Sequence, residues 1–328
     1  MSFKKNLRTD LDELPSITPR AKKLLMENGI VDVEKLAATD LKHLIAFLRD
    51  SDIAIKLTEE AEVIMDRSGF GFVMGDELLE ELESVETMTT GCHTLDAILH
   101  NGLETNRFYA FYGPNGVGKT NLLYQLICMA SKPKDQGGLN SPAIFLDAEG
   151  NFKPQNLKKI ALRFKLNPDK VVKSVARLAI PYADQLIYAL EKKLFPKMEE
   201  TGARIVLLDS ITTNVRAEYV GEGVLWARQG LLGKVAHALK NAAQAFNAVI
   251  VVANQVTTNP HTKEYTYSGG NVLGHEIQVR VSMFKHDKFS DEVWFTVEKA
   301  VDLKQDACIL KLTGSGFYDT EILEKKEP

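Results

Sequence analysis

The chain has 328 residues, of which 45% are hydrophobic and 26% charged, and a formal net charge of -4. This length allows about two domains with a large core, and the mild acidity excludes a protein that binds polyanions over its whole surface. The longest apolar runs, such as residues 248–253, are too short to span a bilayer, and the N-terminus has no apolar region typical of a signal peptide.

The cysteines indicate a reducing compartment. Cys92, Cys128 and Cys308 are far apart, odd in number and without metal-ligand spacing. This usage predicts reduced thiols in a cytosolic or nuclear protein.

Residues 1–67 predict a small helical domain, because apolar residues recur at helical spacing between turn signals. Helices are expected at residues 19–28 and from Val33, Leu41 and Thr58. Residues 68–86 are interpreted as a linker, in which two aromatic residues are exposed unless something covers them.

From residue 87 onward, apolar strands alternate with helices. Strands are expected at Phe108–Tyr112, Ala143–Asp147, Val171–Ala176, Arg204–Asp209 and Ala248–Asn254, with helices at Asn121–Ser131, Tyr182–Lys192 and Leu225–Phe246. This alternation predicts an α/β fold, with a mostly parallel sheet covered on both faces. Three further strands, Ile277–Phe284, Val293–Val297 and Cys308–Leu312, are expected to extend it in antiparallel fashion.

The most specific motif lies between a predicted strand and a predicted helix. It reads Gly113-Pro114-Asn115-Gly116-Val117-Gly118-Lys119-Thr120, followed by Asn121, and matches the phosphate-binding pattern G-x-x-x-x-G-K-[ST]. In such a loop, backbone N–H groups and the helix N-terminus bind phosphate. Lys119 is expected to reach the β- and γ-phosphates and Thr120 to hold Mg²⁺. The chain is therefore predicted to bind a nucleoside triphosphate with Mg²⁺.

Polar residues stand at or directly after the carboxyl ends of three other predicted strands. Asp209 is expected to hold the Mg²⁺ water shell, and Glu149 to polarise the attacking water, although Glu149 also fits a solvated loop acid. Gln255 is a candidate to touch the γ-phosphate and to reorient when it leaves, which would signal to the loop behind it. A capping role for Asn254-Gln255 fits the composition equally well.

The order of these motifs resembles the RecA-like core of the strand-exchange recombinases, in the archaeal RadA and eukaryotic branch. The similar segments are residues 89–96 and 102–105 before the phosphate loop, 145–157 around Glu149, 216–223 with Arg228-Gln229 as a first DNA loop, and 254–256 with 268–275 around a second. The helical N-terminal unit resembles that branch's helix-hairpin-helix domain.

The resemblance implies an ATPase that forms filaments or rings and binds single- and double-stranded DNA. It implies that Asp209, Glu149 and the phosphate loop bind and hydrolyse ATP. Further roles follow for Arg216, Arg228, Lys263, Gly269, Gly270 and Asn271 at DNA, for Phe72 and Gly75 in contact with a neighbouring subunit, and for Lys299 at that subunit's ATP. The expected location is the cytoplasm, with the nucleoid, for an archaeal source, and the nucleus for a eukaryotic one.

Several positions depart from the family pattern. Gly75 replaces an alanine, Glu222 replaces a basic residue of the first loop, the second loop (residues 257–268) is short, and Ser16-Ile17-Thr18 replaces a Gly-x-Gly hairpin. Two hypotheses therefore stand: a strand-exchange recombinase, or a recombinase paralogue that acts as a mediator and exchanges strands weakly, with another recombinase as its partner. A RecA-like helicase or clock-type ATPase fits the core but not the N-terminal unit.

Overall fold

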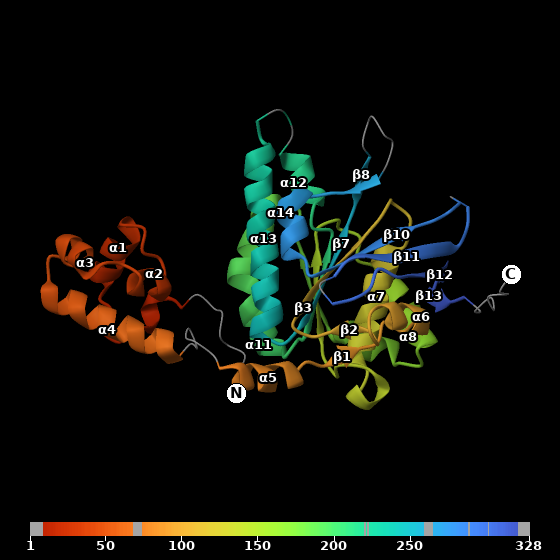
Figure 1. Cartoon of the computed structure of the whole chain (residues 1–328), viewed down its shortest axis with the longest axis horizontal. Coiled ribbons are helices and arrows are strands. Elements are labelled where there is room, and N and C mark those ends of the chain that lie inside the picture. Colours follow the sequence, from red (N-terminus) through yellow and green to blue (C-terminus); the bar gives the residue numbers. More distant parts are fainter. Residues whose placement is uncertain are drawn as a thin grey trace. The chain divides into compact units, whose positions relative to one another are not determined.

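A computed structural model describes residues 9–67, 74–219, 221, 223–258, 265–287, 289–300 and 302–320. The chain divides into two compact units, Met1–Glu83 and Ser84–Pro328 (Figure 1). Within the described residues, no helix combines the length and the apolar character needed to cross a membrane. The thiols of Cys92, Cys128 and Cys308 are free.

The first unit is helical. Its elements are the 3₁₀ turn η1 (Leu11–Glu13) and the helices α1 (Pro19–Glu27), α2 (Val33–Ala37), α3 (Leu41–Leu48), α4 (Ser51–Arg67) and α5 (Gly75–Glu83). Side chains cap most of these helices, as when Asp32 accepts a hydrogen bond from Lys35 N at 2.8 Å. The predicted start of the fourth helix at Thr58 is wrong, because Asp50 accepts a hydrogen bond from Ile53 N and the helix begins at Ser51.

The turn before α1 is held by a carboxylate from α4. Ser16 donates hydrogen bonds to Glu60 from its backbone N at 2.9 Å and from its hydroxyl at 2.5 Å. Fully buried apolar side chains, among them Leu25 and Leu36, form the core of this unit. The turn that was compared with a Gly-x-Gly hairpin therefore has two donors already engaged inside the unit.

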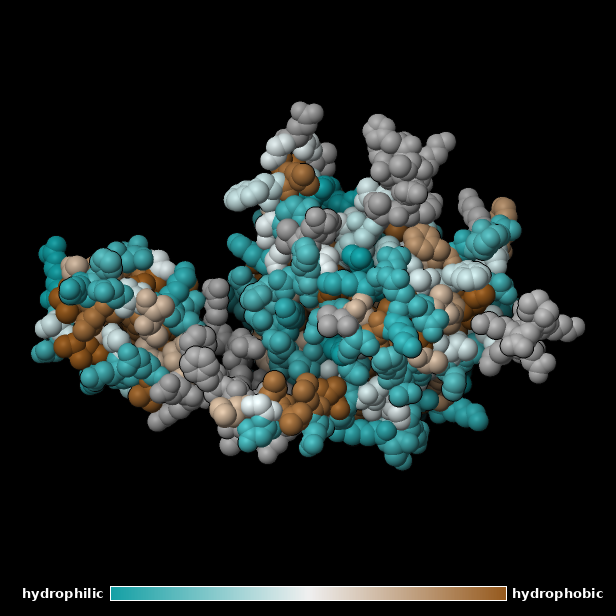
Figure 2. All heavy atoms as spheres, viewed as in Figure 1, coloured by the Kyte–Doolittle hydropathy of each residue, from teal (hydrophilic) through white to brown (hydrophobic). Residues whose placement is uncertain are grey.

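Helix α5 lies within the predicted linker. Its Leu78, Leu79 and Leu82 side chains are exposed by 49%, 62% and 55%. Figure 2 shows a brown, hydrophobic surface over this helix, at the lower edge of the view. Gly75 begins this helix and is exposed, whereas Phe72 lies outside the described residues. The predicted contact of Phe72 with another subunit therefore stays a prediction.

In the described part of the second unit, nine strands form one sheet in the order β13-β12-β11-β10-β3-β7-β6-β4-β5. The sheet strands are β3 (Arg107–Tyr112), β4 (Ala143–Asp147), β5 (Val175–Ala179), β6 (Ile205–Asp209), β7 (Val249–Asn254), β10 (Val279–Phe284), β11 (Glu292–Lys299), β12 (Ala307–Thr313) and β13 (Gly316–Asp319). Two small pairs lie outside it: β1 (Thr87–Met88) with β2 (Leu103–Glu104), and β8 (Val256–Thr258) with β9 (Tyr265–Tyr267).

Helices cover both faces of this sheet (Figure 1). They are α6 (His93–Ile98), α7 (Lys119–Ser131), the 3₁₀ turn η2 (Lys134–Gln136), α8 (Pro154–Arg163), α9 (Pro168–Lys173), α10 (Ala183–Tyr188), a π-helical segment (Ala189–Leu194), α11 (Phe195–Thr201), α12 (Thr213–Glu218), α13 (Leu225–Ala245) and α14 (Gly270–Glu276). Side chains alternate between the faces along each strand. In β3, Phe111 therefore packs with α7 and α8, and Phe108 with α10 and α13.

The predicted α/β class and the mostly parallel sheet are confirmed, with two corrections. The strand expected at Val171–Ala176 is wrong, because Asn167 caps α9 through Asp169 N and Lys170 N and the strand starts only at Val175. The antiparallel extension starts one strand later than expected, since β10 runs parallel to β3 while β11, β12 and β13 are antiparallel.

Candidate nucleotide site and adjoining loops

The predicted nucleotide residues meet at the carboxyl ends of four adjacent parallel strands. The phosphate loop follows β3, Glu149 follows β4, Asp209 ends β6 and Gln255 follows β7. Asp147 is paired in register with Asp209 across β4 and β6. Loops at the carboxyl edge of a parallel sheet form its usual ligand site.

The phosphate loop has the shape that its glycines predict. Gly118 has a φ of 98°, and a Cβ at this position would come within 2.7 Å of Phe317. The Lys119 ammonium donates to the carbonyl oxygens of Gly113 at 2.7 Å and of Pro114 at 2.9 Å. Burial lowers the pKa of Lys119, and the charges of Asp209 and Glu149 oppose this by raising it. The loop therefore holds a cation beside two carboxylates at the start of α7.

Thr120 and Asp209 form the second half of the site. The Thr120 hydroxyl donates to Asp209 Oδ2 at 2.6 Å. Asp209 is 2% exposed, and burial raises its pKa to about 6. A hydroxyl beside a carboxylate is the kind of oxygen pair that holds Mg²⁺ or its waters, so the donor set fits a magnesium triphosphate.

Replacing Asp209 with asparagine is expected to stabilise the protein in the absence of metal and nucleotide. Because the carboxyl pKa rises from 3.8 to about 6 on folding, the folded chain keeps a proton that the unfolded chain has lost, and the free energy of unfolding falls as the pH rises through that window. At pH 7, Asp209→Asn should raise this free energy by about 1–3 kcal/mol and weaken Mg²⁺-dependent nucleotide binding. Urea unfolding at pH 4 and pH 7 tests this: a gain equal at both pH values would contradict it.

Glu149 is held by groups from two other strand ends. Its Oε1 accepts hydrogen bonds from the Thr213 hydroxyl at 3.0 Å and from Gln255 Nε2 at 3.2 Å. The backbone N of Glu149 donates to Asp209 O at 3.0 Å. The carboxylate is half-buried and acts electrostatically on both Lys119 and Asp209. Its position is compatible with accepting a proton from a water at this edge.

An ion pair between the exposed Arg177 and the buried Asp147 supports the loop that carries Glu149. Arg177 donates to Asp147 Oδ2 from Nε at 2.8 Å and from Nη2 at 2.6 Å. Asp147 also accepts hydrogen bonds from the backbone N of Asn151 and of Phe152. The sequence analysis missed Arg177, because its strand was placed too early. One signal was available, an arginine in an apolar edge strand beside an acidic strand end.

Arg177→Ala is expected to lower stability and turnover together. Within the described residues, the buried Asp147 would lose its ion pair with Arg177, which should cost about 1–3 kcal/mol and loosen the loop of Glu149. We expect kcat to fall about tenfold or more, because small misplacements of a catalytic group are costly. Lys197→Ala, which removes an exposed ion pair with Glu200, is the control and should change neither thermal stability nor kcat appreciably.

Hydrogen bonds link this site to both predicted DNA loops. The Thr212 hydroxyl donates to Asn254 Oδ1 at 2.6 Å, and Asn254 Nδ2 donates to Ser268 O at 2.5 Å. Arg216 Nη1 reaches the Ser268 hydroxyl at 3.4 Å. The sequence motifs gave no role to Thr212 or Thr213, although two hydroxyl residues shortly after a strand end were a visible signal, and they included Ser268 only as a boundary of the second loop.

The first-loop arginines line one hollow. Arg216 and Arg228, with Tyr219 and three neighbours, surround about 400 Å³. Glu218, which could have offset them, accepts a hydrogen bond from Ala183 N at 2.8 Å and so directs its charge to the start of α10. Glu222 lies outside the described residues.

The second loop is described only in part, and Lys263 lies outside the described residues. Gly269 follows Ser268 with a φ of 121° and precedes α14, which contains Gly270 and Asn271. The ring of Tyr267 packs edge-on against Tyr112 at 5.1 Å. The contacts of Tyr267 are therefore those of a packing residue.

The Lys299 side chain forms hydrogen bonds with its own chain. Its ammonium donates to the carbonyl oxygens of Gly274 at 2.6 Å, His275 at 3.2 Å and Ile277 at 2.8 Å, where a cation is favourable at the end of α14. Burial lowers the pKa of this lysine. A contact with the ATP of an adjacent subunit would require these hydrogen bonds to be released, and it stays a prediction.

A phosphate loop on a parallel sheet, an acidic strand end opposite it and helices on both faces define a RecA-like P-loop core. The Rad51 family model matches residues 82–320. The chain is 29% identical to the DNA repair and recombination protein RadA of Aeropyrum pernix over 316 residues, which cover 95% of this chain and 97% of that protein. It is 28% identical to the protein of the same name from Ignicoccus hospitalis over 321 residues, 95% and 96% of the two chains. The chain belongs to the Rad51 family, as the sequence motifs predicted.

Proposed function

We propose that this protein is an ATP-dependent recombinase that assembles on single-stranded DNA and pairs it with a homologous duplex. The observation that carries the proposal is that Thr213 and Gln255 both donate hydrogen bonds to Glu149. Thr213 belongs to the helix that carries Arg216, and Gln255 directly precedes the second loop; both donate to the same carboxylate oxygen. One carboxylate at the candidate nucleotide site thus accepts hydrogen bonds from residues at the starts of both predicted DNA loops.

The chemistry would be hydrolysis of ATP. Lys119 and the backbone of the phosphate loop would bind the phosphates, and Thr120 with Asp209 would hold Mg²⁺, whose charge would offset that of the phosphates. Glu149 accepts the proton of the attacking water. The Gln255 and Thr213 donors fix the carboxylate toward the site.

The coupling to DNA would run through the same hydrogen bonds. A terminal phosphate that attracts the Gln255 side chain would weaken its hydrogen bond to Glu149. The movement of Gln255 would then displace the strand β8, which starts at the next residue, Val256. Asn254 and Ser268 connect this movement to Arg216. A nucleotide can only shift such an equilibrium by binding the two loop arrangements differently.

DNA binding would rest on the arginine hollow, and assembly on the segment around α5. The charges of Arg216 and Arg228 suit backbone phosphates. The exposed leucines of α5, directly after the predicted anchor Phe72, offer apolar area to a neighbouring subunit.

A strand-exchange assay with ATP, beside single-stranded DNA binding at several salt concentrations, tests the proposal. We expect ATP-dependent filaments, exchange of a labelled strand, and an affinity that falls steeply with salt. DNA affinity that is the same without nucleotide, with ADP and with ATP would contradict it.

One observation favours a second candidate, a mediator paralogue. The carboxylate of Glu60 occupies the donors of the Ser16 turn, so this turn is poorly suited to phosphate. A mediator would give weak DNA binding and no exchange in the assay above, and would bind the main recombinase of the same cell.

A further inference from the structure

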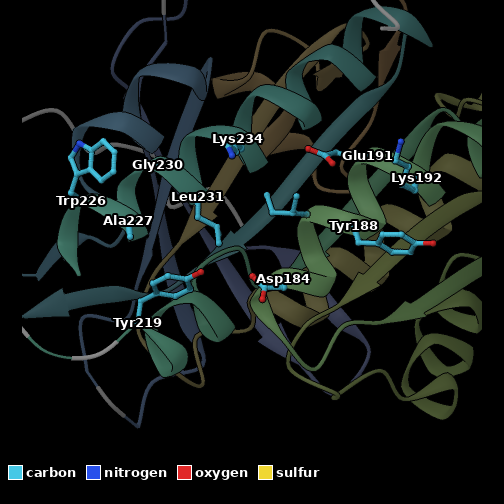
Figure 3. A pocket seen from close by; sticks show the side chains of 11 residues that line it. Asp184, Tyr188, Glu191, Lys192, Tyr219, Trp226, Ala227, Gly230, Leu231 and Lys234 are labelled. Carbon is cyan, nitrogen blue, oxygen red and sulfur yellow. The ribbon is translucent and has the colours of Figure 1, made fainter. Parts of the chain in front are cut away.

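A groove runs between α10 with its π-helical continuation and the first half of α13. It encloses about 570 Å³, within the range of small-molecule sites. Figure 3 shows the rings of Trp226 and Tyr219 at one end, and Tyr188 with Glu191 and Lys192 at the other. Nothing in the function proposed above uses this groove.

Trp226 is the most unusual residue of the groove. It is 87% exposed, although a tryptophan is normally mostly buried. It lies in the first turn of α13, directly after the first predicted DNA loop. Gly230 is one turn further along the same face, and a Cβ built there would meet nothing within 4 Å. An open slot therefore lies beside the indole.

The aromatic end of the groove adjoins the arginine hollow. Tyr219 lines both cavities, so the two adjoin at this ring. The carboxylate of Glu218 is bonded to Ala183 N and so points to α10. Asp184 and Glu191 also line the groove, with Lys192 and Lys234 as cationic counterparts. A cationic hollow beside exposed rings is the combination that binds single-stranded nucleic acid, with phosphates on the arginines and bases stacked on the rings.

We infer that the Trp226 end of this groove is a nucleobase site, in which a base of the single strand stacks on the indole while its phosphate is bound by Arg216 and Arg228. The inference rests on the proposed function and adds a residue that none of the motifs identified. Because every base has an aromatic face, the site would accept any sequence. It would act in each protomer of an assembly on DNA.

Tryptophan fluorescence tests this directly, since Trp226 and Trp294 are the two tryptophans of the chain. In a Trp294→Phe background, addition of oligo(dT) with Mg²⁺ and a non-hydrolysable ATP analogue should quench the emission of Trp226. In fluorescence anisotropy, Trp226→Ala should weaken oligo(dT) binding about tenfold with an unchanged salt slope. Arg216→Ala should instead lower the slope by about one. Trp226→Phe should restore most of the affinity.

Two further variants separate stacking from a general loss of apolar surface. Gly230→Leu keeps the indole but fills the slot beside it, and should weaken binding as Trp226→Ala does. Tyr188→Ala removes an exposed ring from the far end of the same groove (Figure 3) and should leave binding unchanged.

The possible negative results distinguish failure of the nucleobase site from failure of the proposed function. If wild-type protein binds oligo(dT) but Trp226 emission and the affinity of Trp226→Ala do not change, the nucleobase site is wrong and the proposed function stands. If Trp226→Ala reduces self-association without DNA and leaves DNA affinity intact, the groove docks a second copy of the chain instead, and the inference is overturned. If wild-type protein binds no DNA with any nucleotide, the proposed function itself fails.

Discussion

Replacing Glu149 with glutamine is expected to lower kcat for ATP hydrolysis by about 10²- to 10⁴-fold, which is the usual contribution of a general base. The amide oxygen of glutamine can still accept the hydrogen bonds from Thr213 and Gln255, so the geometry should persist while the basicity is lost. Nucleotide affinity should therefore stay near the wild-type value. The triphosphate-bound state should then persist on DNA, with slower release from oligo(dT). Steady-state phosphate release and dissociation kinetics measure the two effects.

The control for this experiment is Thr213→Val. It removes one of the hydrogen bonds to the carboxylate but keeps the base, so kcat should fall by a smaller factor than in Glu149→Gln. Thermal unfolding of both variants should match the wild type within a few degrees. If Glu149→Gln hydrolyses ATP at the wild-type rate, the proton acceptor is another group and the proposed role of Glu149 is wrong.

Lys119→Ala is expected to abolish the dependence of DNA binding on nucleotide. The ammonium is the cation that the phosphate loop holds, through Gly113 O and Pro114 O. Hydrogen bonds to charged groups contribute about 1.5–3 kcal/mol, so the Kd for ATP should rise roughly 10- to 150-fold. At ATP concentrations that saturate the wild type, the variant should bind oligo(dT) as nucleotide-free protein does.

Lys159→Ala is the matched control, because Lys159 is an exposed lysine on the neighbouring helix α8. It removes the same charge from the chain and should leave both affinities unchanged. Isothermal titration with ATP, followed by anisotropy with labelled oligo(dT), reads both quantities. If Lys119→Ala retained nucleotide-stimulated DNA binding, the coupling from the phosphate loop to the DNA loops would be refuted.

The parts of the site that lie next to each other in sequence could be predicted. The phosphate loop depends on glycine spacing and on its flanking strand and helix, all of which are local. Asp209 could be placed because an apolar run that ends in a carboxylate predicts a strand end. The parallel core strands followed from the same apolar runs, whose register across the sheet then brings the strand ends to one edge.

The errors arose where capping outweighed an apolar pattern. Val171 and Val172 favour a strand, but Asn167 and Pro168 start a helix immediately before them. Asp50 likewise starts α4 before the predicted start at Thr58. Asn167 and Asp50 are both residues that favour the N-cap position, so both helix starts are compatible with the sequence.

The hydrogen bonds that connect the site to the loops could not be predicted. Thr213, Gln255 and Glu149 belong to segments far apart in the chain, and they meet only because β4, β6 and β7 are neighbours in the sheet. Trp226 gave no signal either, since its exposure is a property of the folded surface. Pairings of this kind depend on tertiary arrangement, which local patterns do not specify.

The contact of Ser16 with Glu60 has a consequence for how the small helical unit meets other molecules. The carboxylate is tethered to the same unit, so its effective concentration at the turn exceeds that of any dissolved anion. An approaching phosphodiester would have to displace this intramolecular competitor and overcome its negative charge. The Ser16 turn would therefore contribute little to any affinity of this chain for nucleic acid.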